Sequence, residues 1–180
     1  MGAFIIIYNP MNFYKPTTAL LLAISLLVFT TGNGAVVEYN LTIAKTPLNI
    51  SGKPAMGVTV NGGIPGPVLR FTEGDVARIH VTNAMQEPAS IHWHGVLVPN
   101  SMDGVPFLTF PPIQPGSTFT YEFPIRQNGT YWYHSHSELQ EQSGVYGSIV
   151  IEPRGGDSRF GGTTEHVVML SDWTDENPHE

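Results

Sequence analysis

Alternation of apolar and polar residues is the strongest pattern along this chain. Residues 36–43 and 118–125 alternate so that every second side chain would face the same side of a β-strand. The apolar members are Val37, Tyr39, Leu41, Ile43, Phe119, Tyr121 and Phe123. Shorter runs of strand character are found at 68–71, 76–81, 90–98, 130–136 and 145–151. Because no stretch has the period of an amphipathic helix, the pattern predicts an all-β domain.

Turn residues separate these runs. Residues 61–63 (NGG), 65–67 (PGP) and 128–129 (NG) are turn signals, and the Pro- and Gly-containing loop 99–116 has no clear period. The composition agrees, because hydrophobic residues make up 41%, charged residues only 13%, and there are 19 glycines and 15 prolines. Several short strands at regular spacing predict a Greek-key β-sandwich over residues 36–153.

The N-terminal residues predict an export signal. Lys15 precedes an apolar run at 19–29, and small residues follow as far as Ala35. This order is typical of a signal peptide, here residues 1–35. The run is shorter than the roughly 20 residues that a spanning helix needs, so an uncleaved membrane anchor is the alternative. Translation could start at Met1 or Met11.

The C-terminal residues predict a linker and the start of a second domain. Residues 154–164 are Gly-rich and polar, as linkers are. Residues 166–170 have strand character, and one strand cannot bury its own apolar face. We therefore interpret residues 165–180 as the first strand of a truncated second domain. The alternative is a strand that completes the first sandwich.

Charge and cysteine content exclude several function classes. The formal net charge is -7, which argues against nucleic-acid binding, because that function needs a basic surface. The sequence contains no cysteine. Disulfides, thiolate zinc sites, iron–sulfur clusters and a cysteine nucleophile are therefore excluded for this chain, and so is a blue-copper site.

Two His-X-His pairs are the candidate chemistry. His92 and His94 flank Trp93, and His134 and His136 form the second pair. Residues i and i+2 of a strand share a face and lie about 6.7 Å apart. That spacing is awkward for two rings on one ion with bonds of about 2.0 Å, and it suits rings that reach different ions of a cluster. Two such strands side by side would bring four imidazoles to one multinuclear site of copper, zinc, iron or nickel.

A cupin-type mononuclear metal enzyme is a competing interpretation of the second pair. His134, His136 and Glu141 partly match the cupin pattern, but the glycine spacing departs from it. A cupin also gives no reason for a second His-X-His pair. Trp93 and Trp132 are expected to be core residues. The remaining histidines are expected to be surface or hydrogen-bonded residues: His80, His166 and His179.

The segments around both pairs resemble the first cupredoxin domain of multicopper oxidases. These segments are 90–95 (SIHWHG), 102–106 (MDGVP), 129–136 (GTYWYHSH) and 148–153 (SIVIEP). Two further segments are most similar to the periplasmic copper-resistance protein A group of that family, namely 139–142 (LQEQ) and 166–176 (HVVMLSDWTDE).

The resemblance implies a cupredoxin-like fold and a trinuclear cluster of one type 2 and two type 3 coppers, which reduces dioxygen to water. His92 resembles a ligand of the type 2 copper. His94 and His134 resemble ligands of one type 3 copper, and His136 resembles a ligand of the other. Asp103 resembles the acidic residue that assists proton delivery, and the alternative is an ordinary turn aspartate before a glycine.

The resemblance also implies a periplasmic oxidoreductase that oxidises cuprous ion or phenol-like substrates, in copper resistance. Because the chain has no cysteine, the type 1 copper and the other cluster ligands must come from elsewhere. We expect missing C-terminal domains of the same protein to supply them, and we expect this chain alone to be inactive. Its other partners would be copper ions and dioxygen, with no membrane contact after signal cleavage. The alternative is a non-catalytic periplasmic copper-binding protein.

Overall fold

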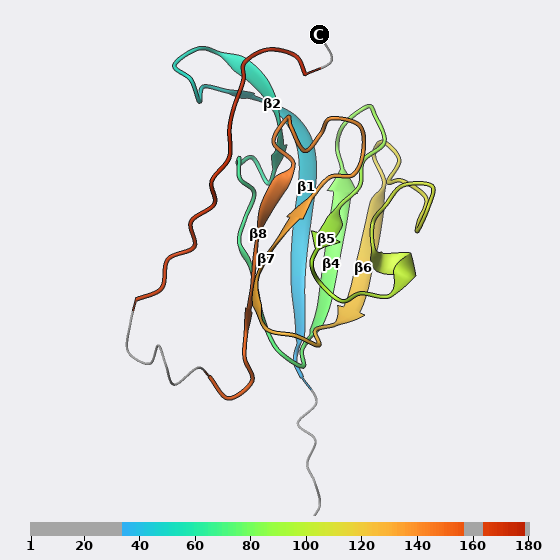
Figure 1. The fold of residues 1–180 in the computed structure, drawn as a ribbon. Helices are drawn as coiled ribbons and strands as arrows, with labels where there is room; N and C mark the ends of the chain where they lie inside the picture. The colour runs from blue at the N-terminus through green and yellow to red at the C-terminus, as the bar shows by residue number, and fades with distance from the viewer. Residues whose placement is uncertain (1–33, 157–163, 179–180) are drawn as a thin grey trace, which may run out of the picture. The chain divides into compact units, whose positions relative to one another are not determined.

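The computed structural model describes residues 34–156 and 164–178, which contain two packed β-sheets (Figure 1). One short 3-10 helix, η1 (Asn100–Met102), lies in the connection between the fifth and sixth strands. The strands are β1 (Val36–Leu48), β2 (Ala55–Val60), β3 (Leu69–Thr72), β4 (Val76–Asn83), β5 (His92–His94), β6 (Thr118–Pro124), β7 (Gly129–His134) and β8 (Tyr146–Glu152).

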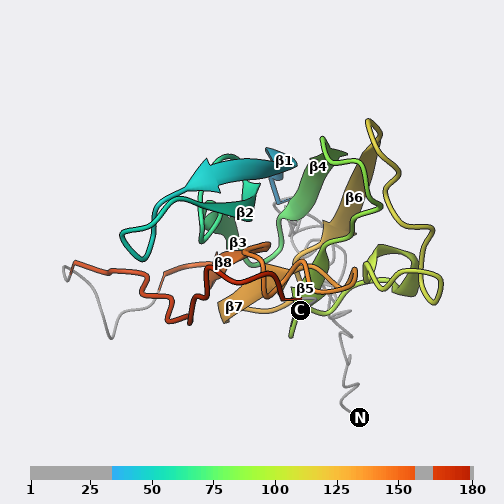
Figure 2. The same ribbon diagram turned by 90° about the horizontal axis from the view of Figure 1, so that it is seen from above.

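The strands form two layers, which Figure 2 shows from above. One sheet has the order β2-β1-β4-β6 and the other has the order β3-β8-β7-β5. The β1–β4 and β3–β8 pairs are parallel, whereas the remaining pairs are antiparallel. The predicted all-β sandwich is confirmed, and its second sheet ends at the edge strand β5, which carries the first histidine pair.

The core lies between the two sheets and is formed by the alternating residues of the sequence pattern. Leu41 and Ile43 of β1 are buried, as are Tyr121 and Phe123 of β6. Trp93 is fully buried, and its ring meets that of Tyr121 edge-on with a centroid separation of 5.0 Å. The core position predicted for Trp93 is therefore confirmed. Burial of these large side chains anchors the edge strand to the sandwich.

Tyr133 anchors the neighbouring strand β7 in the same core. It pairs with Gly147 of β8, where a Cβ atom would lie 2.3 Å from the tyrosine ring. Only glycine leaves room for the ring at this position. The Tyr133 hydroxyl donates to the Pro67 carbonyl at 2.9 Å, and burial raises the pKa of this phenol, so it stays a protonated donor. Together with Trp93, Tyr133 fixes the depth of the two strands that carry the histidines.

Two strands differ from the sequence prediction. The strand predicted at 90–98 is only the three-residue β5, because Gly95 has a φ of 79° and the Val96 N–H turns back to the Trp93 carbonyl at 3.1 Å. The strand β2 was not predicted. Its last four residues are all buried, so it lacks the alternation that marks a half-buried strand.

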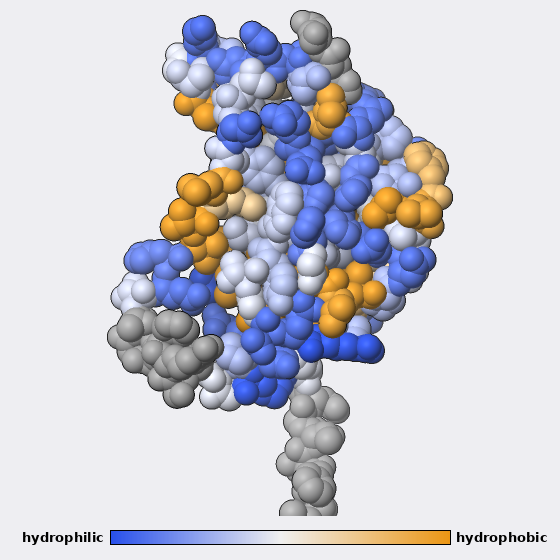
Figure 3. Space-filling model, in the orientation of Figure 1, coloured by the Kyte–Doolittle hydropathy of each residue, from blue (hydrophilic) through white to orange (hydrophobic). Residues whose placement is uncertain are grey.

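The structure has no strand at 166–170, where the sequence predicted the first strand of a second domain. A strand needs backbone partners on a neighbouring strand. This segment and the residue after it instead contact the sandwich through side chains, with the Ser148 hydroxyl 3.7 Å from Met169 Sδ and the Tyr146 hydroxyl donating to Ser171 Oγ at 2.8 Å. Val168 and Leu170 are 76% and 90% exposed, and Figure 3 shows apolar surface on the left edge of this view. The division into a linker and a second domain stays a prediction.

Several predictions lie outside the described residues. Residues 1–33 contain nearly all of the predicted signal peptide, residues 157–163 belong to the predicted linker, and His179 is at the C-terminal end. Over residues 34–156 and 164–178, no helix has both the length and the apolar character that crossing a bilayer requires.

Candidate metal centre

Antiparallel pairing of β5 with β7 brings the two histidine pairs together. His92 lies directly opposite His134, and His94 lies opposite Trp132. The centroid separations among neighbouring rings of His92, His94, His134 and His136 range from 4.9 to 5.7 Å. The predicted convergence of four imidazoles at one place is therefore confirmed. The β5–β7 pair thus carries a cluster of imidazole nitrogens on one face of the sheet.

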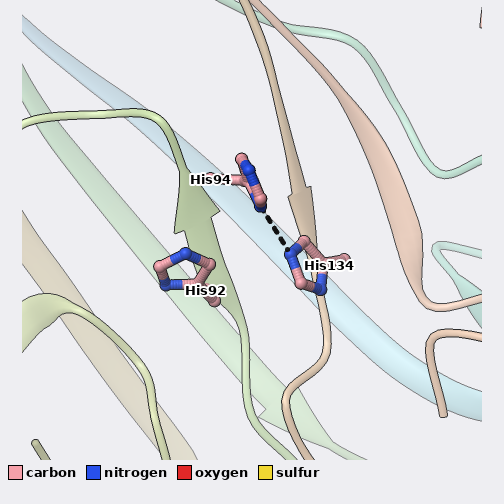
Figure 4. A group of neighbouring side chains, drawn as sticks. All are labelled: His92, His94 and His134. Carbon is pink, nitrogen blue, oxygen red and sulfur yellow. Dashed lines mark hydrogen bonds between the residues drawn. The ribbon is translucent and has the colours of Figure 1, made fainter. Parts of the chain in front are cut away.

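The closest contact in the cluster joins the two strands. His94 Nδ1 lies 3.2 Å from His134 Nε2, which Figure 4 shows as a dashed line. Two nitrogens at this separation can both reach one ion, because metal–nitrogen bonds measure about 2.0–2.1 Å. One nitrogen each of His92, His94 and His134 lie within 4.8 Å of one another. The donor set thus fits a metal centre in which one ion is shared across the strands.

Asp103 orients the His92 ring. Nδ1 of His92 lies 2.7 Å from the Asp103 carbonyl oxygen and 3.3 Å from its carboxylate. Gly104 makes this approach possible, because it has a φ of 77° and a Cβ atom there would lie 1.8 Å from the Ile91 carbonyl oxygen. The Tyr121 hydroxyl in turn accepts the Ile91 N–H at 3.3 Å. The structure thus places Asp103 at the histidine cluster, where the sequence predicted it.

Two acceptors surround Nδ1 of His134. The Glu141 carboxylate lies at 2.7 Å and the Ser135 carbonyl oxygen at 3.0 Å. His134 is only 5% exposed, and this burial lowers its pKa, so the neutral ring predominates at neutral pH. Neutral imidazole keeps a lone pair, which a metal ion requires. Nε2, the nitrogen that faces His94, therefore carries the lone pair that is available to a metal ion.

Trp132 covers the histidines and is not a core residue, so that prediction was wrong. It is half-buried and stacks on His134 with a centroid separation of 4.1 Å and on His94 at 5.0 Å. Trp132 and His134 are two residues apart on β7, so they share a face, whereas Tyr133 points to the core. The period-2 argument that placed Trp93 in the core would have placed Trp132 beside the histidines of the cluster.

Buried serines hold the segment that follows His134. Ser90 Oγ accepts the His136 backbone N–H at 3.0 Å and the Ser137 hydroxyl at 2.9 Å. Ser135 Oγ donates to Gln140 Oε1 at 2.9 Å. The sequence analysis missed this network. The serines before one histidine pair and within the other were its only sequence signal.

The histidines outside the cluster behave as expected where the structure describes them. His80 Nδ1 contacts Thr120 Oγ1 at 2.8 Å, and its other nitrogen lies 3.3 Å from the Glu38 carboxylate. His166 is exposed. The metal-binding prediction therefore stays limited to the two His-X-His pairs.

Comparison with known proteins identifies the family. Residues 42–156 match the family model described as multicopper oxidase. The chain belongs to the multicopper oxidase family. Copper is the cofactor of multicopper oxidases, and imidazole nitrogens suit it. The cupin interpretation is therefore wrong, because a cupin site explains neither the family match nor the second histidine pair.

Among multicopper oxidases, this chain is similar to copper resistance protein A. It is 56% identical to copper resistance protein A from Escherichia coli over 142 residues. This alignment covers 79% of this chain and 23% of that relative. It is 52% identical over 141 residues to the protein of the same name from Pseudomonas syringae pv. tomato, covering 78% and 23%. The chain thus spans about a quarter of the length of these curated relatives.

Solved multicopper oxidases share the fold. Blue copper oxidase from Nitrosomonas europaea is 35% identical, with a TM-score of 0.74, over 81% of this chain and 49% of that one. The laccase from Botrytis aclada is 41% identical, with a TM-score of 0.63, over 67% of this chain and 23% of that one. The cupredoxin-like fold expected for a multicopper oxidase domain is therefore confirmed.

Proposed function

We propose that this chain supplies half of the trinuclear copper cluster of an oxidase. The oxidase would couple one-electron oxidation of cuprous ion or a phenol-like substrate to reduction of dioxygen to water. The 3.2 Å approach of His94 Nδ1 to His134 Nε2, inside a cluster of four imidazoles, is the observation that carries this proposal.

The ligand roles are those that the family resemblance implies, and the contacts of His92, His94 and His134 indicate which ring nitrogens are free to bind copper. His94 and His134 hold one type 3 copper between the strands. His92 binds the type 2 copper through Nε2, because Asp103 occupies its Nδ1 side. His136, beyond the end of β7, binds the second type 3 copper. The chemistry that copper supplies when bound is one-electron oxidation and reduction, and these histidines fix where it takes place.

Asp103 assists proton delivery in this proposal. Reduction of dioxygen to water consumes protons as well as electrons, so a proton donor near the cluster is needed. The Asp103 side chain is 32% exposed and lies 3.3 Å from His92. It thus contacts both solvent and the cluster, which is the position that a proton-transfer group requires.

Other parts of the oxidase complete the site. This sequence contains no cysteine, so the type 1 copper and the remaining cluster ligands would come from C-terminal domains. Two similar curated relatives are named copper resistance proteins, and the chain spans 23% of each. We propose that the oxidase serves copper resistance in the periplasm, after export through the signal peptide at 1–35.

Copper titration of the chain tests the shared site. Replacing both His94 and His134 by alanine should remove one bound copper per chain, measured by elemental analysis after gel filtration. His80→Ala is the matched control, because His80 contacts Thr120 away from the cluster, and it should bind as much copper as the unchanged chain. An unchanged copper stoichiometry in the double variant would refute the proposal. In the intact oxidase, the double variant should also lose oxygen uptake with cuprous ion as reductant.

A further inference from the structure

Glu141 makes the shortest side-chain contact to any ring of the histidine cluster. Its Oε2 lies 2.7 Å from His134 Nδ1. Glu141 belongs to the turn between β7 and β8, where its carbonyl oxygen accepts the Gly144 N–H at 3.0 Å. The preceding residue, Gln140, is buried and bonded to Ser135. The backbone that carries Glu141 is therefore tied to the same segment as the histidine it contacts.

We propose that Glu141 is a positioning residue, which holds the His134 proton on Nδ1 and so presents the Nε2 lone pair to the copper shared with His94. The copper part of this inference rests on the proposed function. Metal-bound histidines commonly donate their second ring N–H to a carboxylate, which fixes the tautomer and strengthens the ligand.

The geometry around the His134 ring favours this tautomer. With the proton on Nδ1, the ring donates to a carboxylate, and a bond to an ionised acceptor is stronger than one to a neutral acceptor. With the proton on Nε2, the Nδ1 lone pair would face the Glu141 oxygen at 2.7 Å, which is repulsive. The Ser135 carbonyl, at 3.0 Å, is the neutral competitor for the same proton. Removing the Glu141 carboxylate should therefore change the His134 tautomer more than removing the Ser135 contact would.

Long-range proton–nitrogen NMR correlations in the metal-free chain test the tautomer directly. We expect the His134 ring of the unchanged chain to be protonated at Nδ1. Glu141→Ala should shift the population toward the Nε2-protonated form, and Glu141→Gln should largely restore the original form, because its amide oxygen accepts the same hydrogen bond. An unchanged tautomer in Glu141→Ala would show that the Ser135 carbonyl and His94 suffice without Glu141, and would overturn the proposal.

Glu152→Gln is the matched control. Its side chain is 49% exposed, against 47% for Glu141, and it pairs with Arg70 instead of with a histidine. Copper affinity is measured by competition with a chelator, and urea unfolding of each variant shows whether the fold is kept. Glu141→Ala should weaken copper binding about 10- to 100-fold. Glu141→Gln should weaken it less, and Glu152→Gln should bind like the unchanged chain.

The two measurements separate this inference from the proposed function. If the intact oxidase binds no copper at the histidine cluster while the His134 tautomer depends on Glu141, the proposed function fails and the positioning role stands. If the unchanged chain binds copper and Glu141→Ala binds it equally tightly, the positioning role is overturned and the proposed function stands.

Discussion

The two His-X-His pairs have the same spacing in sequence, yet they lie in different local structures. His92 and His94 form the ends of the short edge strand β5, where one is half-buried and the other exposed. His134 is the buried last residue of β7, and His136 lies beyond the strand. The spacing places each pair on the same side of the sheet, but it does not determine the groups that orient each ring.

Different segments hold the two pairs. The Asp103–Gly104 loop packs against the backbone before His92, whereas Glu141 and a serine network hold the segment around His134. Because the rings of the two pairs are in contact, a change in the groups that hold one pair should disturb that pair more than the other. The predictions below use this separation, from the largest expected effect to the smallest.

Gly104→Ala should have the largest effect on stability. A methyl group there would overlap the Ile91 carbonyl oxygen, at a Cβ distance of 1.8 Å, and the residue has a φ of 77°. We expect a loss of about 3 kcal/mol, combining left-handed backbone strain with the clash. Urea unfolding measures the loss, and NMR signals should shift at His92 more than at His134.

Gly116→Ala is the control for backbone strain. Gly116 has a φ of 71°, but a Cβ atom there would meet nothing within 4 Å. This variant should lose only about 1 kcal/mol, since it carries the strain without the clash. Equal losses in both variants would contradict the packing of Gly104 against Ile91.

Ser90→Ala should disturb the second pair through its backbone. The change leaves the His136 N–H and the Ser137 hydroxyl without their shared acceptor in a buried setting. Unsatisfied buried groups of this kind destabilise by about 1–3 kcal/mol. Urea unfolding should show this loss, and NMR shifts should be larger at His136 than at His94.

Ser143→Ala provides the comparison for a hydroxyl at the surface. Its Oγ donates to the Leu139 carbonyl at 2.9 Å in an exposed bond, which water can replace. The expected loss is below about 1 kcal/mol. A loss as large as that of Ser90→Ala would mean that the buried network is not what holds His136.

Period-2 patterning predicted much of the fold and the convergence of the site. It gave the alternating strands β1 and β6, the buried Trp93 and the four rings on one side of the sheet. It failed at β2, whose consecutive buried residues have no alternation, and the apolar run at 166–170 has no strand to pair with among the described residues. Periodicity describes a strand's faces, but not the presence of a neighbour.

The groups that orient the rings could not be predicted in this way. Glu141 reaches His134 because the turn between β7 and β8 folds back. Ser90, in the segment before β5, reaches His136 in the segment after β7. Both contacts depend on loop paths, which side-chain periodicity does not encode. Asp103 was found only because its segment resembles a known family, and its contact with His92 depends on the close approach at Gly104.

The buried member of the second pair should make stability depend on pH. Burial holds the pKa of His134 below its ordinary value of 6.5. The unfolded chain therefore binds more protons than the folded chain in the window between the two values, so unfolding is favoured as pH falls. Its stability contribution is complete above pH 6.5 and is lost as pH falls through the folded pKa.

Urea unfolding of the metal-free chain between pH 8 and pH 5 should show this decline, and His134→Gln should show a shallower one. Equal slopes would mean that folding does not lower the pKa of His134, so that burial would not distinguish this histidine from the exposed ones.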